Sequence, residues 1–150
     1  MFLSLKLLLK TLVVIISVCY LLPNSLAAET VVVCHPEQSG EEFSTGELLR
    51  IYAMRKRNWS DGTPITVYTL PKSHSTHQEF VTQFLKLQPH QLNRLWHKLV
   101  FSGTGVQPEV VVSYDEMLEK VAATPGAIGY VDDAKVNVAK KPVVKVALHE

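Results

Sequence analysis

The sequence predicts an α/β sandwich built around one mixed β-sheet. Short apolar or β-branched runs that are typical of strands alternate along the chain with segments whose apolar residues recur every three or four positions, as on one face of a helix. Strands interleaved with helices in this way indicate a sheet covered by helices. Of the 150 residues, 123 follow the N-terminal segment 1–27, which is enough for one modest core and too few for two domains.

The N-terminal segment is predicted to be a cleaved secretory signal peptide. Two lysines precede an uncharged run of 12 residues at 11–22, which is shorter than the roughly 20 residues that a membrane-spanning helix needs. Cleavage after Ala27 places small residues at both positions that a signal peptidase reads. An uncleaved anchor is the alternative. We therefore expect a signal peptide over 1–27, a single domain over 28–150 and export of that domain.

The composition of the domain argues against several classes of partner. The formal charge of the whole chain is +1, and the signal peptide holds two lysines and no acid, so the domain carries −1. This balance provides no field that would gather nucleic acid or anionic lipid. Cys34 is the one cysteine after residue 27, so no disulfide can form within the domain. Its stability must come from packing.

The first half of the domain is predicted to contain two strands separated by a helix. The β-branched run at 30–34 indicates a buried strand. Ser44 and Glu47 have the spacing of a capping box, which predicts a helix over 45–54. An Asp-Gly turn then leads to a strand over 65–70.

A basic stretch follows the first helix. Arg55, Lys56 and Arg57 lie at its C-terminal end, where positive charge interacts favourably with the helix dipole. An anion site is the alternative interpretation of these three residues.

A polar segment at 71–77 is predicted to open the next helix. The cap is formed either by Ser75 with Gln78 or by Thr76 with Glu79, since both pairs have capping-box spacing.

Two further helices are expected. Pro89 opens one as a first-turn proline, and Ser113 with Glu116 caps the other after a short strand at 110–112. The first of these helices has an apolar stripe predicted to face the core: Leu92, Leu95, Trp96, Leu99 and Val100.

The C-terminal part is predicted to add two strands to the sheet. The apolar run at 127–131 indicates a buried strand, Asp132 and Asp133 a turn, and 143–148 a final strand.

The residues do not predict catalysis, a metal or a cofactor. His74 and His77 lie three apart at a helix start, but no third ligand nearby completes a known metal-binding spacing. Cys34 and His35 are adjacent in a strand and point to opposite faces, so they make a poor nucleophile and base. The sequence has no nucleophile elbow, Walker loop or dinucleotide fingerprint. We expect a protein that is not an enzyme.

One segment has the composition of an anion site. Hydroxyls and backbone N–H groups at a helix N-terminus present hydrogen-bond donors and the positive end of the helix dipole. The segment at 72–76 combines such hydroxyls with a lysine, and the loop at 101–108 offers two more hydroxyls. Ordinary helix capping uses the same residue types and is the alternative. The candidate ligand-binding residues are Lys72, Ser73, Ser75, Thr76, Ser102 and Thr104.

The order of these features along the chain is similar to that of a known protein family. After the first helix come a basic stretch, the turn Asn58-Trp59-Ser60-Asp61-Gly62, a strand, a polar helix start leading to Phe80, and the run Gly126-Ala127-Ile128-Gly129-Tyr130-Val131. Over residues 31–131 this order resembles the phosphate-binding proteins of ABC transporters, and in particular their short, single-lobe members. The resemblance implies a single-lobe, periplasmic-binding-protein-like (type II) three-layer sandwich, with phosphate or a similar oxyanion as ligand.

The resemblance also places individual residues. When Thr76 and Phe80 are aligned with the family's Thr and Phe, Thr76 matches a ligand residue. His74 then stands where a ligand-binding Ser is expected, and Leu70 where an Arg is expected. Full-length members have two lobes that close on the ligand. A single lobe leaves one wall of the cleft open to water, which weakens an anion site unless a second subunit or a partner covers it.

Two functions therefore remain open. The first is an exported solute-binding module that binds phosphate or another oxyanion at the Ser/Thr-rich helix start. The second is an interaction protein without a ligand, which docks on a membrane sensor or transporter. An exposed apolar patch around Trp59 or Tyr130 would favour the second.

Overall fold

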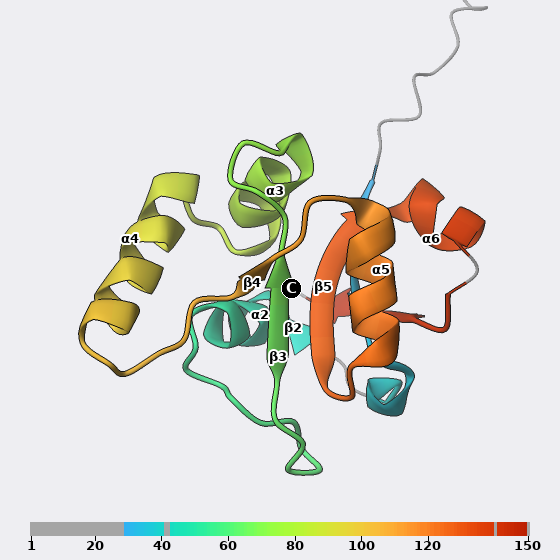
Figure 1. The fold of residues 1–150 in the computed structure, drawn as a ribbon, viewed down its shortest axis with the longest axis horizontal. Helices are drawn as coiled ribbons and strands as arrows, with labels where there is room; N and C mark the ends of the chain where they lie inside the picture. The colour runs from blue at the N-terminus through green and yellow to red at the C-terminus, as the bar shows by residue number, and fades with distance from the viewer. Residues whose placement is uncertain (1–28, 41–42, 140, 150) are drawn as a thin grey trace, which may run out of the picture.

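The computed structural model describes residues 29–40, 43–139 and 141–149 (Figure 1). The signal peptide predicted over 1–27 lies outside them. The strands are β1 Thr30–Cys34, β2 Phe43–Ser44, β3 Thr66–Thr69, β4 Glu109–Val110, β5 Ala127–Asp132, β6 Val144–Lys145 and β7 Leu148–His149. The helices are the 3-10 helix η1 Pro36–Gln38, α2 Thr45–Tyr52, α3 Ser75–Glu79, the π-helix η2 Phe80–Phe84, α4 Pro89–Phe101, α5 Tyr114–Ala123 and α6 Asp133–Ala139.

The main sheet is mixed, as predicted. Within the described residues it has five strands in the order β4-β3-β5-β1-β6. β3 is parallel to both β4 and β5, whereas β1 is antiparallel to β5, with Val32 opposite Tyr130. A small parallel pair, β2 with β7, lies apart from this sheet.

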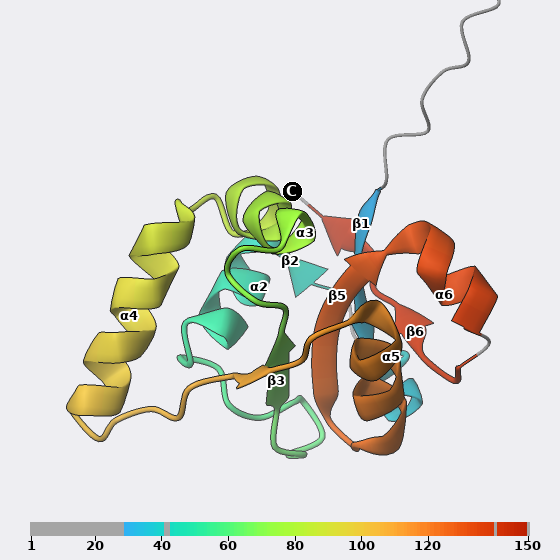
Figure 2. The ribbon, with the colours of Figure 1, turned by 45° about the horizontal axis from the view of Figure 1, so that its top comes forward.

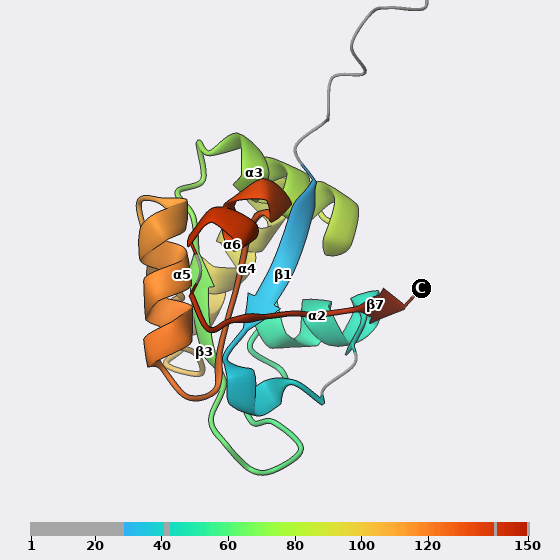
Figure 3. The same cartoon turned by 90° about the vertical axis from the view of Figure 1, so that its right-hand side faces the viewer.

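Helices cover both faces of the sheet, which confirms the predicted three-layer sandwich (Figure 3). Alternate residues of β5 point to opposite faces. Gly129 faces α5, because a Cβ atom there would lie 2.4 Å from Met117 Sδ. Tyr130 faces the other layer, where its ring stacks on Phe80 of η2 with centroids 3.9 Å apart. The Tyr52 ring of α2 completes this buried aromatic cluster, 4.7 Å from the Phe80 ring.

The helix caps at Ser44 and Ser113 are confirmed. Ser44 Oγ accepts the Glu47 N–H at 3.1 Å, and Ser113 Oγ accepts the Glu116 N–H at 3.1 Å. A side-chain oxygen at this position satisfies one of the donors that a helix start leaves unpaired. For that reason the starts of α2 and α5 were predictable to the residue.

Neither capping pair proposed for α3 forms, so that prediction is wrong. The cap is His74, whose Nδ1 accepts the Thr76 N–H at 3.2 Å. A neutral imidazole nitrogen can accept a hydrogen bond as a hydroxyl oxygen does, but capping rules based on Ser, Thr, Asp and Asn do not include it.

The C-terminal prediction is also corrected. The predicted turn at Asp132 and Asp133 is the start of α6, because Asp132 Oδ1 accepts the Ala134 N–H at 2.9 Å and caps the helix. Aspartate is common both in turns and at helix caps because its side-chain oxygen can accept a backbone N–H two residues further along the chain. The single strand predicted over 143–148 is divided into β6 and β7, which pair with β1 and β2 respectively.

α4 packs against the hydrophobic core mainly through its first two turns. Leu92 and Trp96 are buried, and the Trp96 indole N–H donates to the Tyr52 carbonyl oxygen at 2.8 Å. Leu95 and Leu99 are half-buried, but Val100 is 43% exposed, so the predicted core stripe is wrong at its last residue. The C-terminal end of α4 projects from the molecule (Figures 1 and 2).

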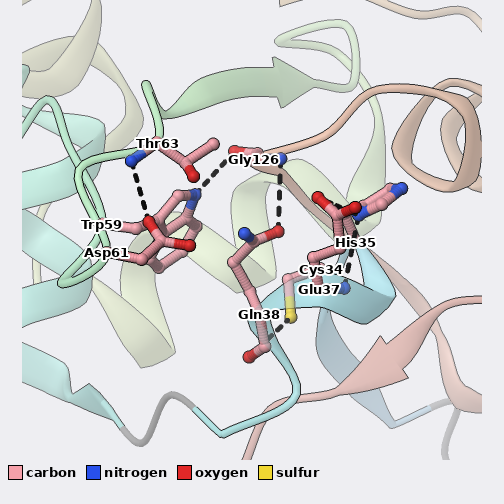
Figure 4. A network of polar contacts seen from close by, with 8 residues as sticks. All are labelled: Cys34, His35, Glu37, Gln38, Trp59, Asp61, Thr63 and Gly126. Carbon is pink, nitrogen blue, oxygen red and sulfur yellow. Dashed lines mark hydrogen bonds and ion pairs between the residues drawn. The ribbon is translucent and has the colours of Figure 1, made fainter.

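A junction at Gly126 joins three distant segments (Figure 4). The Trp59 indole N–H donates to the Gly126 carbonyl oxygen at 2.9 Å, and the Thr66 N–H donates to the same oxygen at 3.1 Å. The Gly126 N–H donates to Gln38 Oε1 at 3.2 Å. The Gly126 junction therefore connects the Trp59 turn to the start of β5.

None of the helices within the described ranges is both long enough and apolar enough to span a membrane.

Candidate functional site at the carboxyl ends of β3 and β4

The candidate site lies where two parallel strands end and two helices begin. β3 leads through residues 70–74 into α3, and β4 leads through residues 111–113 into α5. Because β3 and β4 are parallel, their carboxyl ends lie at the same edge of the sheet, and both helix N-termini are found there (Figures 1 and 2). In α/β sheets this edge is where ligands commonly bind. α3 continues directly into η2, so this helical segment runs over 75–84.

A contact between Thr76 and Tyr114 holds the two helix starts together. Thr76 Oγ1 and Tyr114 Oη are 2.5 Å apart, and the His74 ring meets the Tyr114 ring edge-on with centroids 5.2 Å apart. A hydroxyl has one proton to donate and two lone pairs. If Tyr114 donates to Thr76, the Thr76 hydroxyl proton remains available to a ligand.

The other predicted residues of this segment lie at the surface beside Thr76. Lys72, Ser73 and Ser75 are exposed, whereas Thr76 is buried with 6% of its surface accessible. His74 is half-buried, and since its Nδ1 is an acceptor, the neutral ring carries its proton on Nε2. The segment therefore offers two exposed hydroxyls, an ammonium group and an imidazole N–H around one helix start.

Charge is distributed unevenly between the two helix starts. The first turn of α5 carries Asp115 and Glu116, and one Glu116 carboxylate oxygen accepts the Val112 N–H at 2.8 Å. The first turn of α3 contains no acidic residue, and Lys72 precedes it. An anion at this edge is consequently favoured on the α3 side and disfavoured beside the α5 carboxylates.

Ser102 and Thr104 do not join this group. They follow α4, and the loop that holds them leaves the end of α4 far from α3 (Figures 1 and 2). Their hydroxyls are 2.7 Å apart, and Ser102 Oγ donates to the Leu99 carbonyl oxygen at 3.1 Å. These hydroxyls therefore cap the C-terminal end of a helix, where the dipole disfavours an anion.

A buried polar network lies behind the candidate site. His77 Nδ1 is 2.5 Å from Tyr130 Oη, which also accepts the Leu70 N–H at 3.1 Å and contacts Thr69 Oγ1 at 2.8 Å. Burial raises the pKa of the Tyr130 phenol, so it remains a donor at neutral pH. Burial lowers the pKa of His77 to about 4. His77 is therefore neutral at pH 7, and its Nε2 has no hydrogen-bond partner within the described part of the chain.

Sequence reasoning missed Tyr114 and the structural role of His77. Thr76 and Tyr114 are 38 positions apart, and His77 and Tyr130 are 53 apart, so no local pattern connects them. Only the strand order brings them together. Among the described residues, no three His, Cys, Asp or Glu side chains are grouped as metal ligands would be.

The chain matches a known protein family. A family model described as a PBP superfamily domain matches residues 23–147. A search of the curated proteins found no match.

Several solved structures share this fold. PstS from Borrelia burgdorferi matches with a TM-score of 0.63 and 17% identity, over 81% of this chain and 47% of its own length. A putative phosphate ABC transporter substrate-binding protein from Clostridium perfringens, solved with bound phosphate, matches with a TM-score of 0.61 and 15% identity, over 79% of this chain and 44% of its own. An ABC-type phosphate transport receptor from Vibrio cholerae gives a TM-score of 0.60 and 16% identity, over 79% and 45%.

These matches confirm the predicted resemblance and the predicted single-lobe fold. The chain spans less than half the length of each of the three structures.

Proposed function

Since this chain belongs to the PBP superfamily, we propose that it is an exported, non-enzymatic solute-binding module that holds phosphate or a similar oxyanion where α3 begins. The observation that carries the proposal is the Thr76–Tyr114 contact of 2.5 Å, which joins two helix N-termini at the carboxyl edge of parallel strands. The bound phosphate in the Clostridium perfringens structure supports an oxyanion as the ligand class.

The proposed contacts come from one short segment. The Ser73 and Ser75 hydroxyls and the Lys72 ammonium surround the helix start from the solvent side. In this proposal Tyr114 is the donor in the hydrogen bond that the two hydroxyls share, which leaves the Thr76 hydroxyl proton for the anion. His74 Nε2–H adds a donor at the position where the resemblance expects a serine. Together these groups can replace the water molecules around a small anion with directed hydrogen bonds.

The affinity of this site depends on what covers it. One side of the site is exposed to water and is formed by Lys72, Ser73 and Ser75. Because water surrounds these three side chains, it weakens their electrostatic interaction with an anion. We therefore propose a weak site in the isolated domain, which becomes stronger when a second subunit, a transporter or a membrane sensor covers it. The predicted export through the segment 1–27 would place the domain in the periplasm with such partners.

A second candidate function is docking without a ligand. Trp59 and Tyr130 are buried, so they form no exposed patch. A different set of large apolar side chains is exposed along residues 100–112: Val100, Phe101, Val106, Val110 and Val112. Exposed apolar side chains that are close in sequence favour an interaction surface. This candidate predicts that phosphate has no measurable effect on the protein.

Isothermal titration with phosphate and with sulfate tests the proposed function. The purified protein should give a saturable heat with one oxyanion, and the double variant Ser75→Ala, Thr76→Ala should bind it about tenfold more weakly or not at all, because two donors are removed. The matched control is Ser102→Ala with Thr104→Ala, which removes two hydroxyls at the distant end of α4 and should bind as the unchanged protein does.

A third variant separates ligand contact from helix positioning. Tyr114→Phe keeps every proposed donor but removes the partner of Thr76, so it should weaken binding less than the double variant. If neither oxyanion produces heat up to millimolar concentrations in the unchanged protein, the docking candidate replaces this proposal.

A further inference from the structure

A cavity of about 480 Å³ lies at the amino end of β3, away from the candidate oxyanion site at its carboxyl end. Its walls are the C-terminal end of α2 with the basic stretch that follows it, the start of β3, and residues 105–109, which lead into β4. Its volume lies within the range that small-molecule sites occupy.

The strand pairing explains why the cavity exists. On the side of β3 that faces away from β5, β4 pairs only with Tyr68 and Thr69, so within the described chain no strand lies beside Thr66 and Val67 on that side. The segment before β4 passes this edge as a loop. One end of the loop is fixed at Gly105, where a Cβ atom would lie 2.8 Å from Met54 Sδ, and Arg57 donates to the neighbouring Thr104 carbonyl oxygen.

The interior of the cavity is mainly apolar. Ile51, Met54, Ile65, Val67 and Pro108 contribute to its lining. At the rim, Val106 lines the cavity while 84% of its own surface is exposed to water. An apolar ligand would remove part of this surface from water, which is favourable.

The charge beside this apolar lining is positive. Lys56 and Arg57 both line the cavity. Lys56 is paired with Glu47 at 3.1 Å, and the lining carboxylate of Glu109 is paired with Lys120. Arg57 donates to the Met54 and Thr104 carbonyl oxygens and takes part in no ion pair with the described residues. Its positive charge is therefore the one in the lining that no carboxylate among these residues balances.

We propose that this cavity binds a small amphiphilic anion, with an aliphatic chain between α2 and the 105–109 loop and a carboxylate at Arg57. The apolar lining selects the chain, and the guanidinium selects the anionic end, since Arg binds carboxylates with directed, charge-assisted hydrogen bonds. The site is independent of the proposed oxyanion site, so each can fail without the other.

Titration of the protein with octanoate tests the proposal. We expect saturable binding that tightens with chain length, by about threefold to fourfold for each methylene added from butyrate to octanoate, because each methylene is buried. Octyltrimethylammonium, which has the same chain and the opposite charge, should bind at least tenfold more weakly. Amide chemical shifts should change at Val67 and Gly105, and millimolar phosphate should not reverse these changes.

A pair of arginine variants provides the matched control. Arg57→Gln should weaken octanoate binding by about tenfold. Arg55 lies two residues before Arg57, and its side chain is exposed and outside the lining. Arg55→Gln removes the same charge and should change binding by less than twofold. Circular dichroism verifies that both variants fold. Binding that ignores chain length, shifts that map elsewhere, or equal losses in the two variants would overturn the proposal.

Discussion

The substitution Gly126→Ala is expected to lower the free energy of unfolding by about 3–5 kcal/mol, the largest effect predicted for a single methyl group in this chain. Gly126 has φ +78°, a conformation that residues with a Cβ atom rarely adopt. The added Cβ atom would also lie 2.2 Å from the Pro64 carbonyl oxygen. Relief of that overlap must move the backbone that accepts hydrogen bonds from Trp59 and Thr66, so the Gly126 junction is lost.

Gly62→Ala provides the matched control for this prediction. Gly62 has φ +90°, but no atom lies within 4 Å of the position that its Cβ would occupy. Only the conformational cost remains there, about 1 kcal/mol. Chemical denaturation of both variants at pH 7 measures the difference. Equal losses in the two would show that the close contact with Pro64 is not what makes Gly126 necessary.

The second large effect is a loss of stability in mild acid that depends on His77. Burial lowers the pKa of His77 in the folded protein to about 4, below the value of 6.5 that is usual for histidine. Between these two values the unfolded chain binds more protons than the folded one. The contribution of His77 is therefore fully present above pH 6.5 and is lost as the pH falls toward 4. The free energy of unfolding should drop by about 2 kcal/mol between pH 7 and pH 5 from this residue alone.

The His77→Leu variant isolates this contribution from those of the other titrating groups. The carboxylates and the remaining histidines titrate in both proteins, so the difference between the two pH profiles reports His77. The variant should lose less stability than the unchanged protein on going from pH 7 to pH 5. His97→Leu, at an exposed position of α4, should follow the unchanged protein. Parallel profiles for the unchanged protein and His77→Leu would refute the assignment.

Local signals were sufficient for most of the fold. β1 has the predicted bounds, and the Ser44 and Ser113 caps form because their donors and acceptors lie three residues apart. The same logic was incomplete for α3 and α6. There the capping groups are His74, which local rules omit, and Asp132, whose side chain caps a helix where a turn was expected.

The candidate site depends on contacts that no local signal contains. The hydroxyls at 73–76 mark a helix start in the sequence, but Tyr114 joins them only because β3 and β4 are adjacent and parallel. Ser102 and Thr104 also have hydroxyls, but they lie far from the candidate site (Figures 1 and 2). They follow α4, whose 13 residues form a helix about 20 Å long. Residue type indicated the kind of ligand group, and strand order determined which groups meet.

Chemical-shift mapping with phosphate tests the central claim most directly. We predict saturable changes at the amides of residues 73–77 and of Tyr114 at the start of α5, with none at residues 102–104. Changes confined to other regions, or none at millimolar phosphate, would contradict an oxyanion site at the start of α3.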